Sequence, residues 1–129
     1  TASDRFDGQV DRIRSIKTRR YKLIKNYDVS LPHALDVNYR KKMPMMRRLI
    51  ALSEKGLLDK NAQRWFDTPK AAIEFYDLQK DPFELNNLAG KALYTKKLRK
   101  LNSLLEQWII DTNDLGRLPE QEIIGYSIN

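Results

Sequence analysis

The hydrophobic and polar positions along the chain alternate between strand-like and helix-like patterns, and they predict a series of short elements. Residues 10–15 and 21–27 mix β-branched, aromatic and leucine side chains with charged neighbours, as half-buried strands do. The polar residues 17–20 between them are short enough to connect a hairpin. Residues 73–78 have the composition of a third strand, and the Asp-Pro step at 81–82 favours a turn after it.

Helical spacing dominates two other parts of the chain. Residues 44–56 begin with a proline and carry an apolar stripe up to Gly56, which predicts a helix with a glycine stop. A second short helix is expected from Asp59, as N-cap, to Trp65. The strongest pattern covers residues 92–113, where apolar side chains recur every three or four positions and so share one face of a helix. These side chains are Tyr94, Leu98, Leu101, Leu105 and Trp108.

The order of the elements predicts an α+β fold with a small antiparallel β-sheet packed against a long C-terminal helix and with short helices in the connection. We expect a single domain over residues 1–129. Residues 28–42 contain Pro32 and little periodicity, which indicates an ordered loop. Residues 118–129 have the composition of an irregular tail whose apolar side chains need a partner surface.

Composition excludes several kinds of site. The 129 residues contain no cysteine, so they form no disulfide, thiolate metal site or cysteine nucleophile. His33 is the single histidine, which excludes a multi-histidine metal site, and no metal site is expected in this chain. Five scattered glycines do not form a phosphate-binding loop. No apolar run reaches the roughly 18 residues of a transmembrane helix, so no membrane partner is expected.

The formal net charge of +7 leaves three interpretations of the surface open: it binds polyanions in general, it binds single-stranded nucleic acid, or it only contacts solvent. Basic residues gather around Tyr21 and Tyr39, and a surface of this kind attracts nucleic acid, acidic glycans or anionic lipid. A single-strand nucleic-acid platform would add stacking aromatics, but both tyrosines lie where a small core would use them, and no nucleic-acid motif is present. A basic face that only contacts solvent is the third interpretation.

Three stretches of the chain carry a family pattern. Residues 4–7 read D-R-F-D, residues 11–16 read D-R-I-R-S-I, and residues 20–27 read R-Y-K-L-I-K-N-Y. A Leu-Pro-His sequence follows at 31–33. The most specific stretch is E-F-Y-D-L at 74–78, then D-P-F-E at 81–84 and N-N-L-A at 86–89. Together they resemble the C-terminal part of the arylsulfatase-like family, especially its heparan N-sulfatase-type branch. In physical terms the last stretch is a strand followed by a turn that Asp81 and Asn87 cap, with Leu88 returning to the core.

The resemblance implies a small four-stranded antiparallel sheet and a C-terminal helix beside an N-terminal catalytic domain of the same polypeptide. It also implies that this domain holds calcium and a formylglycine made from the first residue of a Cys/Ser-x-Pro-x-Arg motif. Residues 30–34, S-L-P-H-A, begin like that motif, but Ala34 stands where arginine is required. No catalytic residue is therefore expected in this chain, which alone should be inactive. The parent is expected to be a periplasmic or secreted hydrolase.

Three residues are candidates for contact with a sulfated carbohydrate substrate by this resemblance. Arg5 would pair with a sulfate or carboxylate of a neighbouring sugar, as guanidinium groups do with planar anions. Asp7 would accept hydrogen bonds from sugar hydroxyls, and His33 would donate one to an anionic group. The alternatives are a local Arg5–Asp7 ion pair and a histidine that only completes its loop. For the whole chain, the alternative is a free-standing basic module that binds polyanions such as sulfated glycans or nucleic acid.

Overall fold

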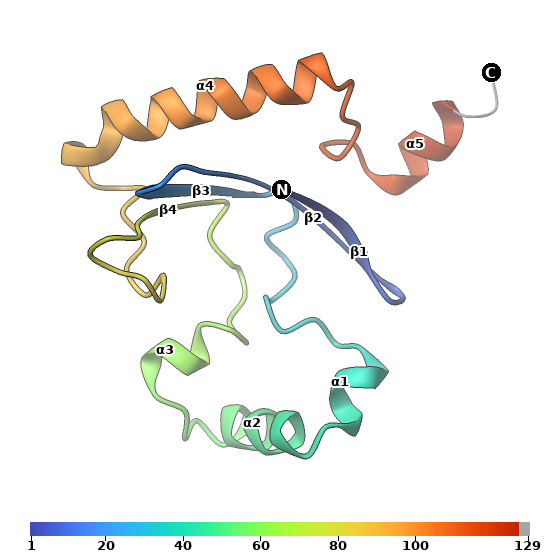
Figure 1. The fold of residues 1–129 in the computed structure, drawn as a ribbon. Helices are drawn as coiled ribbons and strands as arrows, with labels where there is room; N and C mark the ends of the chain where they lie inside the picture. Colours follow the sequence, from blue (N-terminus) through green and yellow to red (C-terminus); the bar gives the residue numbers. More distant parts are fainter. Residues whose placement is uncertain (127–129) are drawn as a thin grey trace.

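The computed structural model describes residues 1–126, in which an antiparallel sheet separates one long helix from a group of short helices (Figure 1). The four strands lie in the order β1 (Ala2–Phe6), β2 (Gln9–Lys17), β3 (Tyr21–Asn26) and β4 (Ile73–Asp77). The short helices α1 (Asn38–Lys42), α2 (Pro44–Glu54) and α3 (Lys60–Gln63) connect β3 to β4. A 3-10 turn, η1 (Ala92–Tyr94), leads into α4 (Thr95–Asp111), and α5 (Glu120–Tyr126) follows. The predicted α+β fold and four-stranded antiparallel sheet are confirmed.

The hydrophobic core lies between the sheet and α4. Leu23 from the central strand β3 and Phe75 from the edge strand β4 are fully buried against the inner face of α4. The Tyr21 ring stacks on the Phe75 ring with centroids 5.5 Å apart. Adjacent residues of a strand point to opposite faces of the sheet. The residues next to Leu23 and Phe75 in the sequence therefore have their side chains on the face away from α4. That second face carries the polar site described below.

The α4 stripe agrees with the predicted pattern except at its end. Leu101 and Leu105 are buried, but the third buried residue is Ile109, while Trp108 is 41% exposed. The prediction for Trp108 was wrong because steps of four and three average 3.5 residues, whereas a straight helix has 3.6 residues per turn. The contact face therefore drifts to position 109 by the fourth turn.

The turn after β4 is capped by side chains as the sequence predicts. The Asp81 carboxylate accepts hydrogen bonds from the amides of Leu85, at 3.0 Å, and Asn86, at 2.7 Å. Asn87 Oδ1 accepts from the amides of Phe75 and Ala89, both at 3.0 Å. These bonds tie the turn to the strand, so the motif that carries the family resemblance is structural.

Two of the expected irregular segments contain helix, and one strand has no sequence pattern. Part of the expected loop 28–42 forms α1, and part of the expected tail 118–129 forms α5; residues 127–129 lie outside the described part of the chain. The helix α5 starts after Pro119 and has Glu120 and Glu122 in its first turn, where the helix dipole favours acidic groups. All residues of β1 are exposed, so this edge strand has no apolar alternation to reveal it. No helix within residues 1–126 is long and apolar enough to cross a membrane.

Candidate functional site

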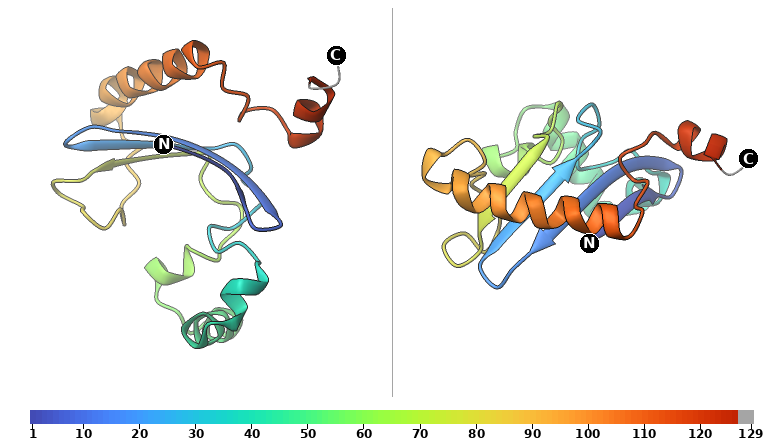
Figure 2. Two further views of the ribbon diagram at one scale, coloured as in Figure 1. Left: turned by 45° about the vertical axis from the view of Figure 1, so that its right-hand side comes forward. Right: turned by 90° about the horizontal axis from the view of Figure 1, so that it is seen from above.

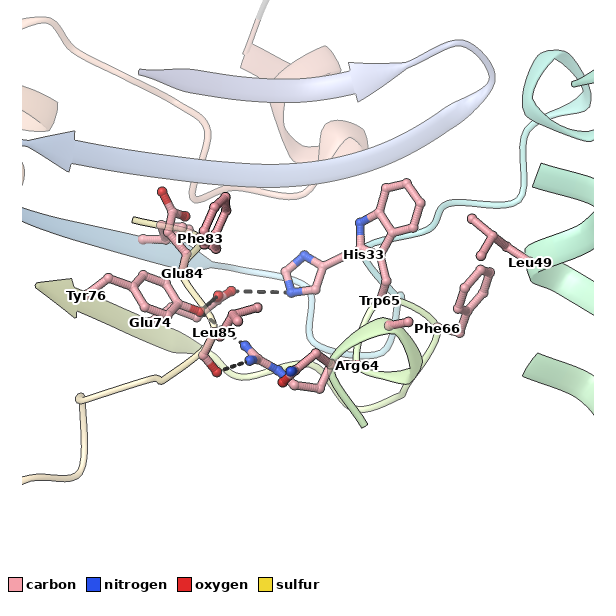
Figure 3. A pocket seen from close by; sticks show the side chains of 13 residues that line it. His33, Leu49, Arg64, Trp65, Phe66, Glu74, Tyr76, Phe83, Glu84 and Leu85 are labelled. Atoms are coloured by element: carbon pink, nitrogen blue, oxygen red, sulfur yellow. Dashed lines mark hydrogen bonds and ion pairs between the residues drawn. The ribbon is translucent and has the colours of Figure 1, made fainter. Parts of the chain in front are cut away.

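A cavity of about 430 Å³ lies on the face of the sheet opposite α4, and we call it the His33 cavity (Figure 3). Strands β3 and β4 form its floor, and the segment around α3 and the turn after β4 form its walls (Figures 1 and 3). Its polar side chains are those of His33, Asn61, Arg64, Glu74, Tyr76 and Glu84; its apolar ones are those of Ile24, Leu49, Ala62, Trp65, Phe66, Phe83 and Leu85.

Glu74 is the centre of the polar floor. Its side chain projects from β4 on the face opposite Phe75, two positions before Tyr76. Asn26 Nδ2 donates to Glu74 Oε1 at 2.6 Å, and the Tyr76 hydroxyl donates to Glu74 Oε2 at 2.5 Å. Burial and the bond to Glu74 raise the pKa of Tyr76 well above its usual range, so its hydroxyl stays protonated and remains a donor.

His33 lies at the edge of this floor, with its Nε2 3.4 Å from Glu74 Oε1 (Figure 3). Burial lowers the pKa of His33, and the nearby Glu74 carboxylate opposes that effect only in part. The imidazole is therefore mostly neutral at neutral pH and can serve as a hydrogen-bond donor or acceptor. A bound anion would favour its protonated form.

Arg64 supplies the cation of the cavity. It follows α3, whose N-terminus Asp59 caps by accepting from the amides of Asn61, at 2.8 Å, and Ala62, at 3.1 Å, as the sequence predicts. Arg64 Nη2 donates to the Tyr76 hydroxyl at 3.3 Å, and Nη1 donates to the backbone oxygen of Leu85. These contacts leave part of the five-donor guanidinium fork available to a ligand.

Aromatic rings complete the cavity beside its polar groups. Trp65 and Phe66 meet edge to face with centroids 6.1 Å apart, and Trp65 is 40% exposed. Flat apolar rings next to a cation, an imidazole and a carboxylate suit a saccharide, which has one apolar face and a rim of hydroxyls. The cavity is therefore suited to hold a sugar, by ring contact and by hydrogen bonds from Arg64 and His33.

A buried ion pair lies close to the His33 cavity. Lys70 Nζ is 2.5 Å from Asp11 Oδ2, and both side chains are buried. Lys70 also lines a smaller cavity of about 160 Å³ together with His33 and Glu74. Within residues 1–126, no group of three or more His, Asp or Glu side chains could hold a metal ion.

The structure does not bring the three predicted substrate contacts together. Arg5 pairs with Glu120 and lines a separate cavity of about 460 Å³ on the side of α4 and α5. Asp7 is exposed in the β1–β2 turn, with φ at 56°, and does not pair with Arg5. Only His33 lies in the cavity opposite α4.

Sequence reasoning missed Arg64, Trp65, Glu74 and Tyr76. One signal was present: in I-E-F-Y-D, the positions of Glu74 and Tyr76 share the face opposite Phe75, so a carboxylate and a phenol point to the same side of the sheet. No local pattern predicts that Arg64 reaches them.

Two characterised sulfatases are similar to this chain. An ulvan-active sulfatase from Formosa agariphila is 38% identical over 124 residues, which are 96% of this chain and 21% of that protein. An N-acetylglucosamine-6-O-sulfatase from Bacteroides thetaiotaomicron is 53% identical over 34 residues, which are 26% of this chain and 6% of that protein. No protein-family model matches the chain.

The chain thus spans about a fifth of the length of the first relative. Neither relative is named an N-sulfatase, so the heparan N-sulfatase branch suggested by the motifs is not supported. Both of these relatives are sulfatases, and the ulvan-active sulfatase matches nearly the whole length of this chain.

Proposed function

We propose that this chain is the C-terminal subdomain of a sulfatase that acts on sulfated carbohydrate. The observation that carries the proposal is the 38% identity to the ulvan-active sulfatase along 96% of the chain, in an alignment that covers only 21% of that protein. The subdomain supports the fold of the parent and borders its substrate pocket. Hydrolysis of the sulfate ester or sulfamate belongs, in this proposal, to an N-terminal domain of the same polypeptide.

The chemical groups of the proposed reaction divide between these two parts. Calcium and formylglycine would supply the ligand for the sulfate group and the nucleophile. In this proposal both groups belong to the N-terminal domain, and no reaction step falls on this chain. Its contribution is to hold the carbohydrate: Arg64 and His33 donate hydrogen bonds, and Trp65 provides a ring surface.

The division of labour is tested by sulfate release. The longer polypeptide that contains this chain and the chain of residues 1–129 alone are incubated with ulvan and with N-acetylglucosamine 6-sulfate, and free sulfate is measured. We expect release by the longer polypeptide and none by the chain alone. Turnover by the chain alone, or no release by the longer polypeptide from either substrate, would contradict the proposal.

The contact proposed for His33 is tested in the longer polypeptide. His33→Ala should lower kcat/KM by roughly five- to tenfold, because it removes about one hydrogen bond of 1 kcal/mol to the bound sugar. Lys55→Ala at the exposed end of α2 is the matched control and should leave kcat/KM unchanged. Equal values for both variants would exclude His33 from the substrate pocket.

Arg5 and Asp7, which lie in the β1–β2 hairpin and outside the His33 cavity, are proposed as further contacts to the substrate of the parent protein. Arg5→Ala removes both the guanidinium and its ion pair with Glu120, whereas Glu120→Gln weakens the ion pair and keeps the guanidinium. A substrate role predicts a lower kcat/KM for Arg5→Ala and little change for Glu120→Gln. Asp7→Asn keeps a residue that tolerates the positive φ and should also lower kcat/KM. If Arg5 instead serves only to hold the ion pair with Glu120, Arg5→Ala and Glu120→Gln should lower kcat/KM by the same factor.

A further inference from the structure

Two stretches of the sequence that contain no acidic residue lie side by side at one end of the sheet. The chain has seven cationic residues between Asp11 and Asp28 and five between Glu84 and Glu106, which together are half of its 24. The first stretch contains the β2–β3 turn and β3, and the second contains the start of α4, which packs over this part of the sheet (Figures 1 and 2). Lys97 Nζ lies 4.9 Å from the centroid of the Tyr21 ring, and Arg20 Cζ lies 5.0 Å from it. The fold therefore adds the charges of the two stretches on one surface.

Ion pairs neutralise only part of this charge. Arg14, Arg20, Lys22 and Lys25 have carboxylate partners at Asp4 and Asp114, Asp77, Glu84 and Glu106. Seven further side chains of the two stretches are exposed, and none has a carboxylate within 4.0 Å among residues 1–126; they are Lys17, Arg19, Lys91, Lys96, Lys97, Arg99 and Lys100. We call five of them the basic end: Lys17, Arg19, Lys96, Lys97 and Lys100.

We propose that the basic end binds a sulfated polysaccharide chain, at a surface separate from the His33 cavity. Ammonium groups on flexible stems attract the closely spaced sulfates of such a polymer and release its counterions, as they do with other polyanions. The site holds the polymer as a whole, whereas the His33 cavity is sized for a sugar unit. The choice of a sulfated glycan rests on the proposed function, but the binding itself needs no turnover.

The aromatic contacts favour a glycan over nucleic acid. Proteins that bind single strands without sequence preference stack bases on exposed aromatic rings. Tyr21 is the aromatic residue that follows the β2–β3 turn, and its ring already contacts Phe75, Tyr94 and the cationic side chains of Arg20 and Lys97. The basic end is thus a set of point charges without a stacking platform.

The second basic cluster of the sequence, around α1 and α2, is a weaker candidate. Lys41 pairs with Asp36, and the Arg40 guanidinium lies over the rings of Phe6 and Trp65, 5.0 and 5.7 Å from their centroids. The exposed Glu54 at the end of α2 further lowers the local charge. This cluster therefore provides the matched control.

The test compares two triple variants of the chain that each remove three exposed cations. The first, Arg19→Gln, Lys96→Gln and Lys100→Gln, lies in the basic end. The control, Lys42→Gln, Arg47→Gln and Arg48→Gln, lies on α1 and α2. Far-UV circular dichroism verifies that both fold. Binding of a fluorescent heparin dodecasaccharide is followed by anisotropy at several salt concentrations, and a single-stranded RNA with the same number of charges is the second probe.

We expect the first variant to bind the heparin probe about tenfold more weakly or worse at low salt, and the slope of log Kd against log salt to fall by about two to three. The control should lose less than about threefold. Equal losses in the two variants, or no binding by the unmodified chain, would overturn the proposal. The assignment to a glycan would be overturned if the unmodified chain bound the RNA as strongly as the heparin probe and the first variant bound the RNA more weakly as well. Sulfate release is not measured here, so the outcome is independent of the proposed enzymatic function.

Discussion

Arg14 joins three parts of the fold through two carboxylates, and removal of one carboxylate should destabilise the protein measurably. Its side chain is only 3% exposed. Nε and Nη2 donate to the two carboxylate oxygens of Asp114, both at 2.8 Å, and Nη1 and Nη2 donate to Asp4 at 2.6 and 3.0 Å. The residue thereby connects β2 to the edge strand β1 and to the segment after α4. The perturbation is Asp114→Ala.

The magnitude follows from what remains after the substitution. Removing one partner of a buried ion pair costs about 3–5 kcal/mol. Here Asp4 still pairs with the guanidinium, so we expect a loss of about 2–4 kcal/mol in the free energy of unfolding. For a chain of 129 residues this corresponds to a fall of about 8–15 °C in Tm. Urea and thermal unfolding of the chain, followed by circular dichroism, measure both quantities.

The pH dependence gives an independent check. The hydrogen bonds from Arg14 hold the pKa of Asp114 below its usual value of 3.8. The stability difference between the unmodified chain and Asp114→Ala should therefore be complete above that value and disappear as the pH falls through the lower folded-state pKa. The control, Asp111→Ala, removes an exposed carboxylate that bonds Gln107 and should change stability by about 0.5 kcal/mol or less. Equal losses in the two variants, or a difference that persists unchanged at the lowest pH, would refute the reasoning.

Two further predictions concern the space around the Arg14 guanidinium and the His33 cavity. Gly116→Ala places a Cβ 1.6 Å from Arg14 Nη2, so it should cost about 1–3 kcal/mol, whereas Gly90→Ala, which meets no atom within 4 Å, should be nearly neutral in the same unfolding assay. Burial lowers the pKa of His33, and the Glu74 carboxylate raises it. Glu74→Gln removes that carboxylate, so an NMR titration should give a lower His33 pKa than in the unmodified chain. An equal or higher pKa would show that Glu74 does not raise the pKa of His33.

Local patterns predicted the elements whose contacts are close in sequence. The α4 stripe depends on spacing within one helix, and the Asp81 and Asn87 caps lie within a few residues of most of the groups they bond. Asp59 as N-cap is of the same kind. The edge strand β1 was not predicted by pattern, because its stability comes from the ladder to β2 and from the Arg14–Asp4 pair rather than from an apolar face.

The candidate site could not be predicted in this way, because its contacts join distant parts of the chain. Glu74 lies 48 residues from Asn26, and Arg64 reaches Tyr76 only because α3 ends beside β4. The sequence presents Glu74 as one charge in an apolar strand. Its burial becomes visible only when the strand is placed against β3 and the loop that carries His33.

The two faces of β4 explain why the family motif and the candidate site share one strand. Phe75 points into the core below α4, which fixes the strand and, through the Asn87 bonds, the turn that follows it. This placement forces Glu74 and Tyr76 onto the opposite face, where burial requires that each find a hydrogen-bond partner. The polar network with Asn26 and Arg64 meets that requirement. Phe75 does not line the His33 cavity, but its contacts in the core set the position of β4, which forms the floor of that cavity. A substitution at Phe75 should therefore change the shape of the His33 cavity.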